Sequence, residues 1–444
     1  MTEHFPVAAT AREIASEVRA GRLDPVLVAE RTIAGIEAAD RIIGAFRTVR
    51  AEAALDEARA VKVRDDLATL PLAGVPVAVK DVVGIRGERV TSGSRAFPAE
   101  PATQDHEIVR RLRAAGAVLV GLTRVPELVA WPMTDSPDAI TRNPWQPAYS
   151  AGGSSGGSGA AVAAGLVPVA HGTDGLGSVR FPAAMCGLVG LKAGADLLGE
   201  ADWYGMSMHG SLATTVADAA LLLSVLAEEP SLAEIGEPGT LRVAVSTVVP
   251  LTRAPVPRPL RSAVDRVAAV LAGAGHRIEF ATPRYGIEAP LGILGRWFAG
   301  VAEDADGLNE SLLQPRTRTH LRIGRAVRAA GLIRPGTRRR WVARAEEFFG
   351  SHDVLLTPTL ATLPPKAARW HERSWPANAV TAIRLGPFTG LWNLAGYPAI
   401  SVPAARHPSG LSLGVQLVTT PGGEARLLAL AAQLERLNPW RRVP

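Results

Sequence analysis

The chain has 444 residues, of which 47% are hydrophobic and 20% are charged, so it is long enough to bury a large core and too apolar for a disordered protein. Its single cysteine, Cys186, excludes an intrachain disulfide bond and any zinc or iron–sulfur site built from cysteines. The formal net charge of +6 is modest for a chain of this length.

Two helices are predicted before residue 50. Thr10 followed by Glu13 is a capping-box pattern that begins the first helix, and Gly21 ends that segment. Asp24 and Pro25 then supply an N-cap and a first helical residue for the second helix.

From residue 72 onward, short β-branched runs alternate with helical patterns. The predicted strands are 75–79, 118–122, 167–170, 354–357 and 399–402. The predicted helices are 106–115, 160–164, one capped by Thr215, a basic helical stretch at 292–345, and 424–437. A glycine-rich turn is predicted at 172–177. This alternation indicates an α/β sheet with helices packed on it.

Neither a secretory signal nor a membrane span is predicted. The N-terminal MTEHFPVAAT lacks a basic segment followed by an apolar one. The longest apolar stretches, such as residues 160–170, are shorter than the roughly 18 residues that a membrane span needs. We therefore expect a soluble protein of the cytoplasm.

Only four of the 48 basic residues are lysines, namely Lys62, Lys80, Lys192 and Lys366, which leaves 48 − 4 = 44 arginines. This bias indicates that arginine has replaced lysine wherever either serves, so a remaining lysine is a candidate for a role that requires loss of its proton. The alternative explanation, for at least two of these four lysines, is that they were retained by chance. Lys80 ends a predicted buried strand, where desolvation lowers the pKa of an amine and suits it to act as a general base.

Two glycine-rich segments surround serines. Residues 151–158 contain Ser154, and residues 172–182 contain Ser178. Glycines let the backbone turn sharply and aim N–H groups at one point, as an oxyanion hole requires. Serine with lysine is a known variant of the nucleophile–base pair. Each segment alone is a weak signal, because a glycine–serine run is more often a flexible loop.

Together and in this order, these segments resemble the amidase signature family, and the resemblance covers nearly the whole chain. Residues 142–145, 187–192 and 393–403 also resemble that family. The resemblance implies a single α/β domain with a central mixed β-sheet flanked by helices on both faces. Its expected parts are N-terminal helices at about 8–65, a signature core at about 70–230, a variable helical elaboration at about 290–345 and a C-terminal return to the core at about 350–444.

The resemblance also implies a Ser–Ser–Lys triad with no metal and no cofactor. Ser178 would be the nucleophile and Lys80 the base, with Ser154 relaying the proton between them, 178 − 154 = 24 residues before the nucleophile. The implied oxyanion hole consists of the backbone N–H groups of Gly175, Leu176, Gly177 and Ser178. Thr173, Asp174 and Arg180 would hold the loop in shape.

Leu176 departs from the family pattern, which has glycine at this position. If the position requires a positive φ, a leucine costs about 1 kcal/mol or more and misaims an N–H group. The open outcomes are an unaffected loop, a narrowed acyl pocket and a weakened hydrolase. The loop that includes Trp203, Tyr204 and Met206 also departs from the family and is expected near the pocket mouth.

Phe181 and Met133 are candidate substrate-binding residues. An apolar ring after the motif arginine favours a hydrophobic acyl group, and the alternative is that both residues are simply core. His171 is expected to be packed or hydrogen-bonded, and Cys186 to be a buried hydrophobe. The arginines at 316–344 are interpreted as a solvated helix face and not as a nucleic-acid site.

The expected function is hydrolysis of a small linear carboxamide to a carboxylic acid and ammonia or an amine through an acyl-enzyme. One alternative is a glutaminase-type subunit of an amidotransferase, and another is a catalytically impaired family member that serves as a binding or scaffold subunit. The expected partner is a small-molecule amide, and neither a nucleic acid nor a membrane is expected. Whether the protein forms a homodimer is left open.

Overall fold

The computed structural model describes residues 9–198 and 202–444. Residue 8, where the N-terminal helical region was expected to begin, lies outside the described residues. Eleven strands form one sheet: β1 (Phe46–Val49), β2 (Pro76–Lys80), β3 (Val118–Thr123), β6 (Val169–Asp174), β7 (Val189–Lys192), β8 (Met208–Ala213), β9 (Arg242–Val245), β10 (Arg277–Phe280), β11 (Val354–Pro358), β12 (Ala399–Arg406) and β13 (Ser412–Val418). A separate pair consists of β4 (Arg142–Asn143) and β5 (Gln146–Ser150).

The sheet is mixed, with the strand order β1-β3-β2-β6-β8-β7-β12-β13-β11-β9-β10. Strand β2 is parallel to both of its neighbours, β3 and β6, and β9 is parallel to β10 and β11. The other pairs in the sheet are antiparallel. The expected α/β fold with a central mixed sheet is confirmed.

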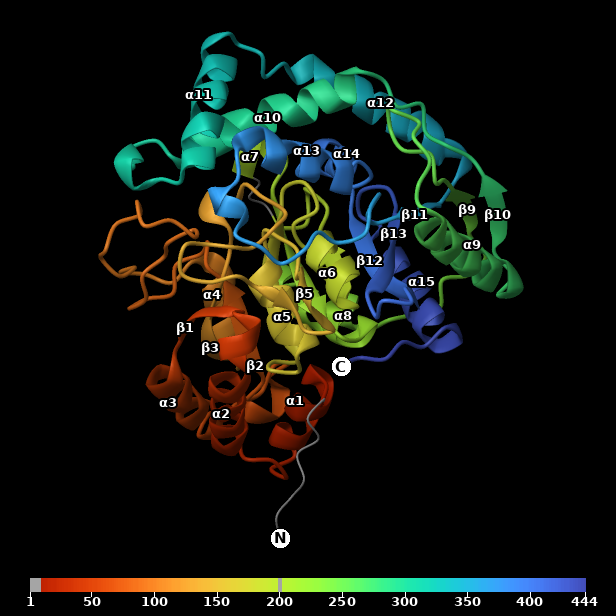
Figure 1. The fold of residues 1–444 in the computed structure, drawn as a ribbon. Coiled ribbons are helices and arrows are strands. Elements are labelled where there is room, and N and C mark those ends of the chain that lie inside the picture. The colour runs from red at the N-terminus through yellow and green to blue at the C-terminus, as the bar shows by residue number, and fades with distance from the viewer. Residues whose placement is uncertain (1–8, 199–201) are drawn as a thin grey trace.

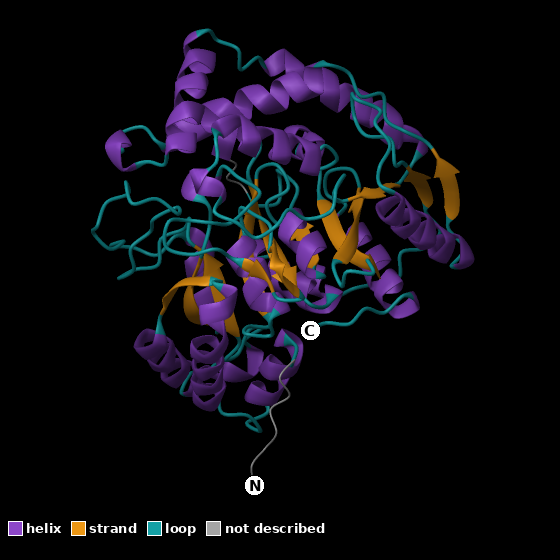
Figure 2. Cartoon of the chain, in the orientation of Figure 1, coloured by secondary structure: helices purple, strands orange, loops and turns teal. Residues whose placement is uncertain are grey.

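Helices surround this sheet (Figure 2). They are α1 (Ala11–Arg19), α2 (Pro25–Ile43), α3 (Ala51–Lys62), α4 (Glu107–Ala114), α5 (Gly156–Ala163), α6 (Arg180–Cys186), α7 (Asp202–Gly205), α8 (Val216–Ala227), α9 (Arg258–Gly273), α10 (Glu288–Asp304), α11 (Pro315–Ala329), α12 (Pro335–Ser351), α13 (Trp375–Leu385), α14 (Gly390–Ala395) and α15 (Glu424–Leu437). In Figure 1, α10, α11 and α12 form an arc over α7, α13 and α14 at the top of the view. No helix among the described residues is long and apolar enough to cross a membrane.

The predicted helix starts are confirmed at both N-terminal helices. The Thr10 side chain accepts from the N–H of Glu13, and the Glu13 carboxylate accepts from the N–H of Thr10, which completes the capping box. Asp24 caps α2, with Pro25 as its first residue.

Side chains alternate across β2, and this alternation places Lys80. Val77 and Val79 pack into a cluster with α1, α8, α9 and α15 on one face of the sheet, whereas Ala78 packs with α2, α3, α5 and α6 on the other. Because successive strand residues point to opposite faces, Lys80 lies on the same face as Ala78, beside α5.

The glycine–serine run is only partly a loop. Its second half forms the start of α5, all of whose residues are buried. A Cβ on Gly157 would lie 2.4 Å from Ala45 O and 2.5 Å from Arg124 N, so only glycine lets α5 pack this closely. The turn expected at 172–177 is also shorter, since β6 extends through Gly172 and Thr173 to Asp174.

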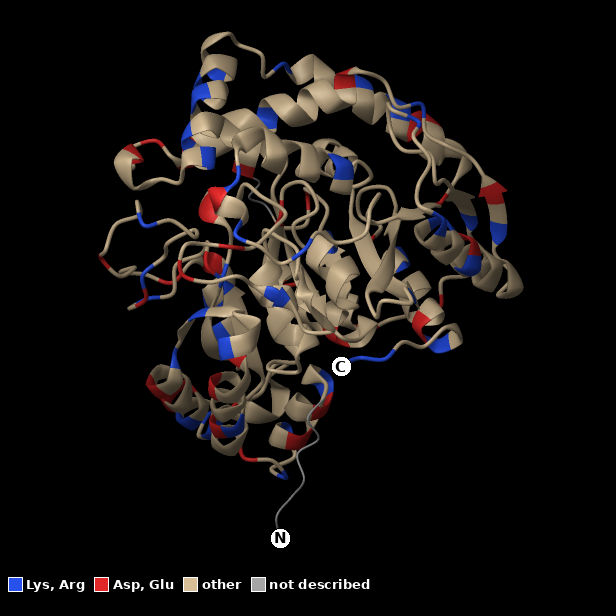
Figure 3. Cartoon of the chain, viewed as in Figure 1, with Lys and Arg blue, Asp and Glu red and all other residues tan. Residues whose placement is uncertain are grey.

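The basic helical stretch lies at the rim of the molecule, with acidic residues among the basic ones (Figure 3). Arg325 pairs with Glu310, and Arg328 pairs with Asp306. Arg316 differs from the expected solvated face, because it is 1% exposed and forms an ion pair with Asp135 at 3.1 Å. It joins the helical arc to the core.

Candidate active site

Two parallel strands bring Lys80 and Thr173 together. Strands β2 and β6 are neighbours, with Ala78 paired to Ala170, so their carboxyl ends meet at one edge of the sheet. Ser154 lies just before α5, the helix that packs on this face. The peptide bond between Gly153 and Ser154 is cis.

The Lys80 amine is fully buried and has three polar neighbours. Its Nζ lies 2.8 Å from Ser154 Oγ, 2.7 Å from Thr173 Oγ1 and 3.2 Å from Thr173 O. Burial lowers the pKa of Lys80 to about 7, although the negative charge of Asp174 opposes this shift. The amine is therefore uncharged in a large fraction of molecules at neutral pH.

Ser178 lies next to this pair. Its carbonyl oxygen accepts from the N–H of Ser155 at 3.2 Å, which ties the Ser178 loop to the residue that follows Ser154. Ser154 and Ser178 both line a cavity of about 330 Å³. The structure thus brings the three residues of the predicted triad to one place, with Thr173 beside the lysine.

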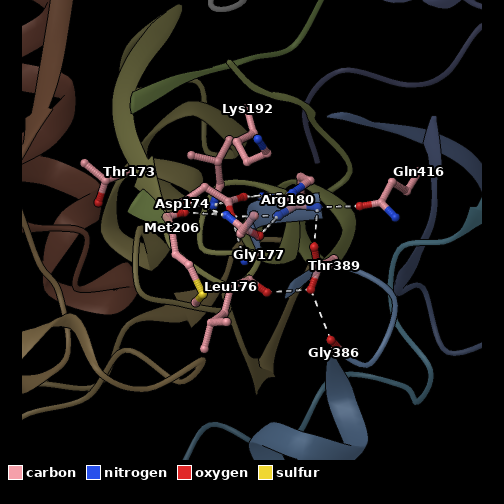
Figure 4. A network of polar contacts seen from close by, with 12 residues as sticks. Thr173, Asp174, Leu176, Gly177, Arg180, Lys192, Met206, Gly386, Thr389 and Gln416 are labelled. Atoms are coloured by element: carbon pink, nitrogen blue, oxygen red, sulfur yellow. Dashed lines mark hydrogen bonds and ion pairs between the residues drawn. The ribbon is translucent and has the colours of Figure 1, made fainter. Parts of the chain in front are cut away.

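A buried ion pair holds the loop that carries Ser178 (Figure 4). Arg180 Nε and Nη2 donate to the two oxygens of Asp174 at 2.9 and 2.8 Å, and both side chains are fully buried. Burial by itself would raise the pKa of Asp174, but the charge and hydrogen bonds of Arg180 outweigh it and hold that pKa well below its usual range. Arg180 also donates to Asn393, Gln416 and the carbonyl of Thr389.

Within this loop, the residue with positive φ is Gly177 and not Leu176. Gly177 has a φ of 128°, whereas Leu176 is not among the described non-glycine residues with positive φ. The leucine therefore carries no left-handed strain. The N–H group of Gly177 was expected to face the oxyanion hole. It instead donates to Asp174 Oδ1 at 2.6 Å, within the loop. Of the four N–H groups predicted for the oxyanion hole, that of Gly177 is thus the one with a described partner inside the loop.

A second, largely apolar cavity of about 510 Å³ also reaches Ser178. Its wall includes Trp131, Leu176, Phe181, Ile293, Trp297 and Leu391. The only charged residue among its described lining residues is Arg384, which is exposed. Leu176 thus contributes its side chain to the wall of this cavity.

The two candidate substrate-binding residues differ in position. Phe181 lines the apolar cavity. Met133 is 1% exposed and lines neither cavity at Ser178; its neighbours Trp131 and Pro132 line the apolar one instead. Trp203, from the loop expected near the pocket mouth, lines both cavities, whereas Tyr204 and Met206 line neither.

The residues expected to be structural are buried away from solvent. His171 Nε2 lies 2.9 Å from His209 Nδ1, and burial lowers the pKa of His171 well below its usual value. Cys186 is fully buried, and burial raises the pKa of its thiol. Neither residue lines the cavities at Ser178.

Sequence reasoning gave no role to Asn393, Thr389 or Gln416. Asn393 Nδ2 donates to the carbonyl of Asp174 at 2.6 Å, and Thr389 Oγ1 donates to the carbonyl of Leu176. Asn393 opens a segment that resembles the family, and this was the one available signal. These contacts join positions more than 200 residues apart, such as Asp174 and Asn393 with a separation of 219.

We expect Arg180→Leu to destabilise the protein by about 3–5 kcal/mol, because it leaves the Asp174 carboxylate buried without its counter-charge. Urea unfolding followed by circular dichroism measures this change. Arg325→Leu is the matched control, since it removes an ion pair whose partners are both 44% exposed and should cost about 1 kcal/mol or less. Equal losses in the two variants would show that the buried pair does not hold the loop.

Comparison with known proteins shows the family of this chain. The family model described as Amidase matches residues 28–428. "Putative amidase AmiB2" of Mycobacterium tuberculosis (strain ATCC 25618 / H37Rv) is 40% identical, covering 98% of this chain and 96% of that protein. The 6-aminohexanoate-cyclic-dimer hydrolase of Pseudomonas sp. (strain NK87) is 33% identical, covering 95% of this chain and 93% of that protein. A solved structure of 6-aminohexanoate cyclic dimer hydrolase complexed with substrate has a TM-score of 0.89 at 30% identity, covering 98% of both chains. The chain therefore belongs to the Amidase family, the amidase signature enzymes.

Proposed function

We propose that this protein hydrolyses amides with an apolar acyl group, with Ser178 as nucleophile, Ser154 as proton relay and Lys80 as base. The observation that carries this proposal is the environment of the Lys80 amine. It is fully buried, has a pKa lowered to about 7 and lies 2.8 Å from Ser154 Oγ.

The three partners of Nζ suit both protonation states of the amine. A neutral amine has two donors and one lone pair, so it donates to Thr173 Oγ1 and Thr173 O while Ser154 Oγ–H donates to it. A protonated amine has three donors and no acceptor, so it donates to all three oxygens. Lys80 can therefore take up a proton and return it without changing its contacts.

In the acylation step, Ser178 Oγ attacks the amide carbonyl carbon, and the carbonyl π bond opens to an oxyanion. The Ser178 proton passes to Ser154 Oγ while the Ser154 proton passes to Lys80 Nζ. The N–H groups of Gly175, Leu176 and Ser178 are the donors available to the oxyanion. When the oxyanion collapses, the C–N bond breaks, the leaving nitrogen takes the Ser154 proton, and Lys80 returns its proton to Ser154. Water then cleaves the ester by the same route and releases the carboxylic acid.

The apolar cavity favours a hydrophobic acyl group over glutamine. Glutamine would bring an ammonium and a carboxylate close to the reacting amide, and burying either without a partner is costly. No carboxylate is among the described residues that line this cavity, and its only charge is the exposed Arg384. We therefore place the glutaminase alternative second. A linear amide is not required, because one relative is named as the hydrolase of a cyclic dimer.

A fluorophosphonate tests this proposal, because it transfers its phosphoryl group to an activated serine with loss of fluoride. We expect one adduct by intact-mass spectrometry and its location at Ser178 by peptide mapping. A decyl fluorophosphonate should react roughly tenfold faster than one with a triethylene glycol chain, since the apolar chain loses contact with water in the cavity. Absence of any adduct on folded protein would reject the proposal and favour the scaffold alternative.

A further inference from the structure

Ser178 lines two cavities of opposite character. The apolar cavity is described above, and the second cavity, of about 330 Å³, is polar. Its wall includes Ser154, His106, His209, Asp202 and Asp304. Besides Ser178, Val129 and Trp203 line both cavities.

The position of Ser154 indicates which half of the substrate binds in each cavity. In the proposed function, Ser154 gives its proton to the leaving nitrogen, so the leaving group must lie on the side of Ser154. Ser154 lines the polar cavity and does not line the apolar one. The amine half of the substrate therefore lies in the polar cavity, and the acyl half in the apolar one.

The ionisable side chains of the polar cavity favour a cationic ligand over an anionic one. In a chain with 48 lysines and arginines, neither residue type is among the described residues that line it. Burial lowers the pKa of His209 to about 4, and the nearby charges of His106, Lys80 and Arg111 act in the same direction, so His209 is uncharged at neutral pH. The ionisable acids of this wall are Asp202 and Asp304.

Asp304 is the side chain best placed to act on a ligand. Its Oδ2 accepts from Trp203 Nε1 at 2.7 Å. Burial and the nearby charges of Asp202 and Glu303 raise the pKa of Asp304 to about 7, so a bound cation would stabilise its ionised form. No described lysine or arginine forms an ion pair with it. It is also the last residue of α10, where the helix dipole disfavours a carboxylate. The helix end therefore does not favour an acid at this position, and the roles left for the carboxylate are to accept from Trp203 and to attract a cation.

We propose that the leaving group of the substrate carries a cationic nitrogen and that Asp304 binds it. This inference rests on the proposed function, because it uses Ser154 to orient the substrate. The substrate class is an apolar acyl group joined through an amide to a diamine. A leaving group that carries a carboxylate is disfavoured, because it would meet Asp202 and Asp304 without a basic side chain to bind it.

Two matched substrates test this inference, N-butyl decanamide and N-(4-aminobutyl) decanamide, which differ in the terminal ammonium. We expect wild-type kcat/KM to be about tenfold higher for the aminobutyl amide, and the ratio to fall to about one in Asp304→Asn. Asparagine keeps an oxygen that accepts from Trp203 and removes the charge. Asp306→Asn is the control, because Asp306 pairs with Arg328 and does not line the cavity, and it should leave the ratio unchanged.

A wild-type preference for the butyl amide, or a ratio that persists in Asp304→Asn, would overturn the inference. Competitive inhibition of the wild type by 1,4-diaminobutane and not by butylamine supports it without any variant, and equal inhibition by both amines overturns it. If the wild type hydrolyses neither amide, the proposed function fails. Calorimetric binding of 1,4-diaminobutane to the wild type and to Asp304→Asn then decides whether the polar cavity binds diamines.

Discussion

Ser178→Ala should lower kcat for an apolar amide by roughly 10⁴-fold to 10⁶-fold, because the variant lacks the oxygen that forms the acyl-enzyme. Loss of a single hydroxyl leaves the cavities, the buried lysine and the loop network in place. The measurement is release of the amine product by mass spectrometry at saturating substrate, together with loss of the fluorophosphonate adduct. Thermal unfolding should change little, since no hydrogen bond of the Ser178 side chain stabilises the loop among the contacts described above.

Ser158→Ala is the matched control for this variant. Ser158 lies in the glycine–serine run, but its Oγ is 2.7 Å from Thr123 Oγ1 and donates to the carbonyl of His171 at 2.8 Å. It lines neither cavity at Ser178. We expect this variant to lose about 1–2 kcal/mol of stability and to keep its turnover per folded molecule. Full activity in Ser178→Ala would eliminate the proposed nucleophile.

The position of Lys80 could be predicted from the sequence because strand geometry decides it. An apolar run of β-branched residues predicted the strand, and alternation along β2 places Ala78 and Lys80 on the face that α5 covers. The helix caps at Thr10 and Asp24 were predictable for a similar reason, since a cap depends on residues within one turn.

Contacts between distant residues could not be predicted in this way. The sequence predicted a helix only from residue 160, whereas α5 begins at Gly156, and Gly157 is required by the approach of Ala45 and Arg124, which only tertiary packing reveals. The consequence of Leu176 depended on which loop residue has positive φ, and the structure gives that conformation to Gly177. The partners of Arg180 at Thr389 and Gln416 lie 209 and 236 residues away. Local patterns carry no information about such pairs.

Lys80→Met should lower kcat/KM by about 10³-fold, within the range expected for removal of a general base. Methionine is similar in length, so it fills the buried space and removes only the titratable amine. The wild-type rate should rise as pH increases through about 7 and then level off, because burial lowers the pKa of Lys80 to about 7 and only the uncharged amine accepts a proton. An ordinary lysine would instead require pH values above 10. The residual rate of the variant should lack this rise, and stopped assays from pH 5.5 to 9.5 measure both profiles.

Lys192 is the competing explanation for such a pH profile, because burial also lowers its pKa to about 7. Its Nζ donates to the carbonyl of Ala193 at 2.8 Å, and Lys192 lines neither cavity at Ser178. Lys192→Met should therefore retain the rise near pH 7, whereas Lys80→Met should lose it. Lys62→Met removes an exposed lysine paired with Asp24 and should change neither rate nor profile. If the rise disappears in Lys192→Met and persists in Lys80→Met, the base is not Lys80, and the relay through Ser154 loses its proton acceptor.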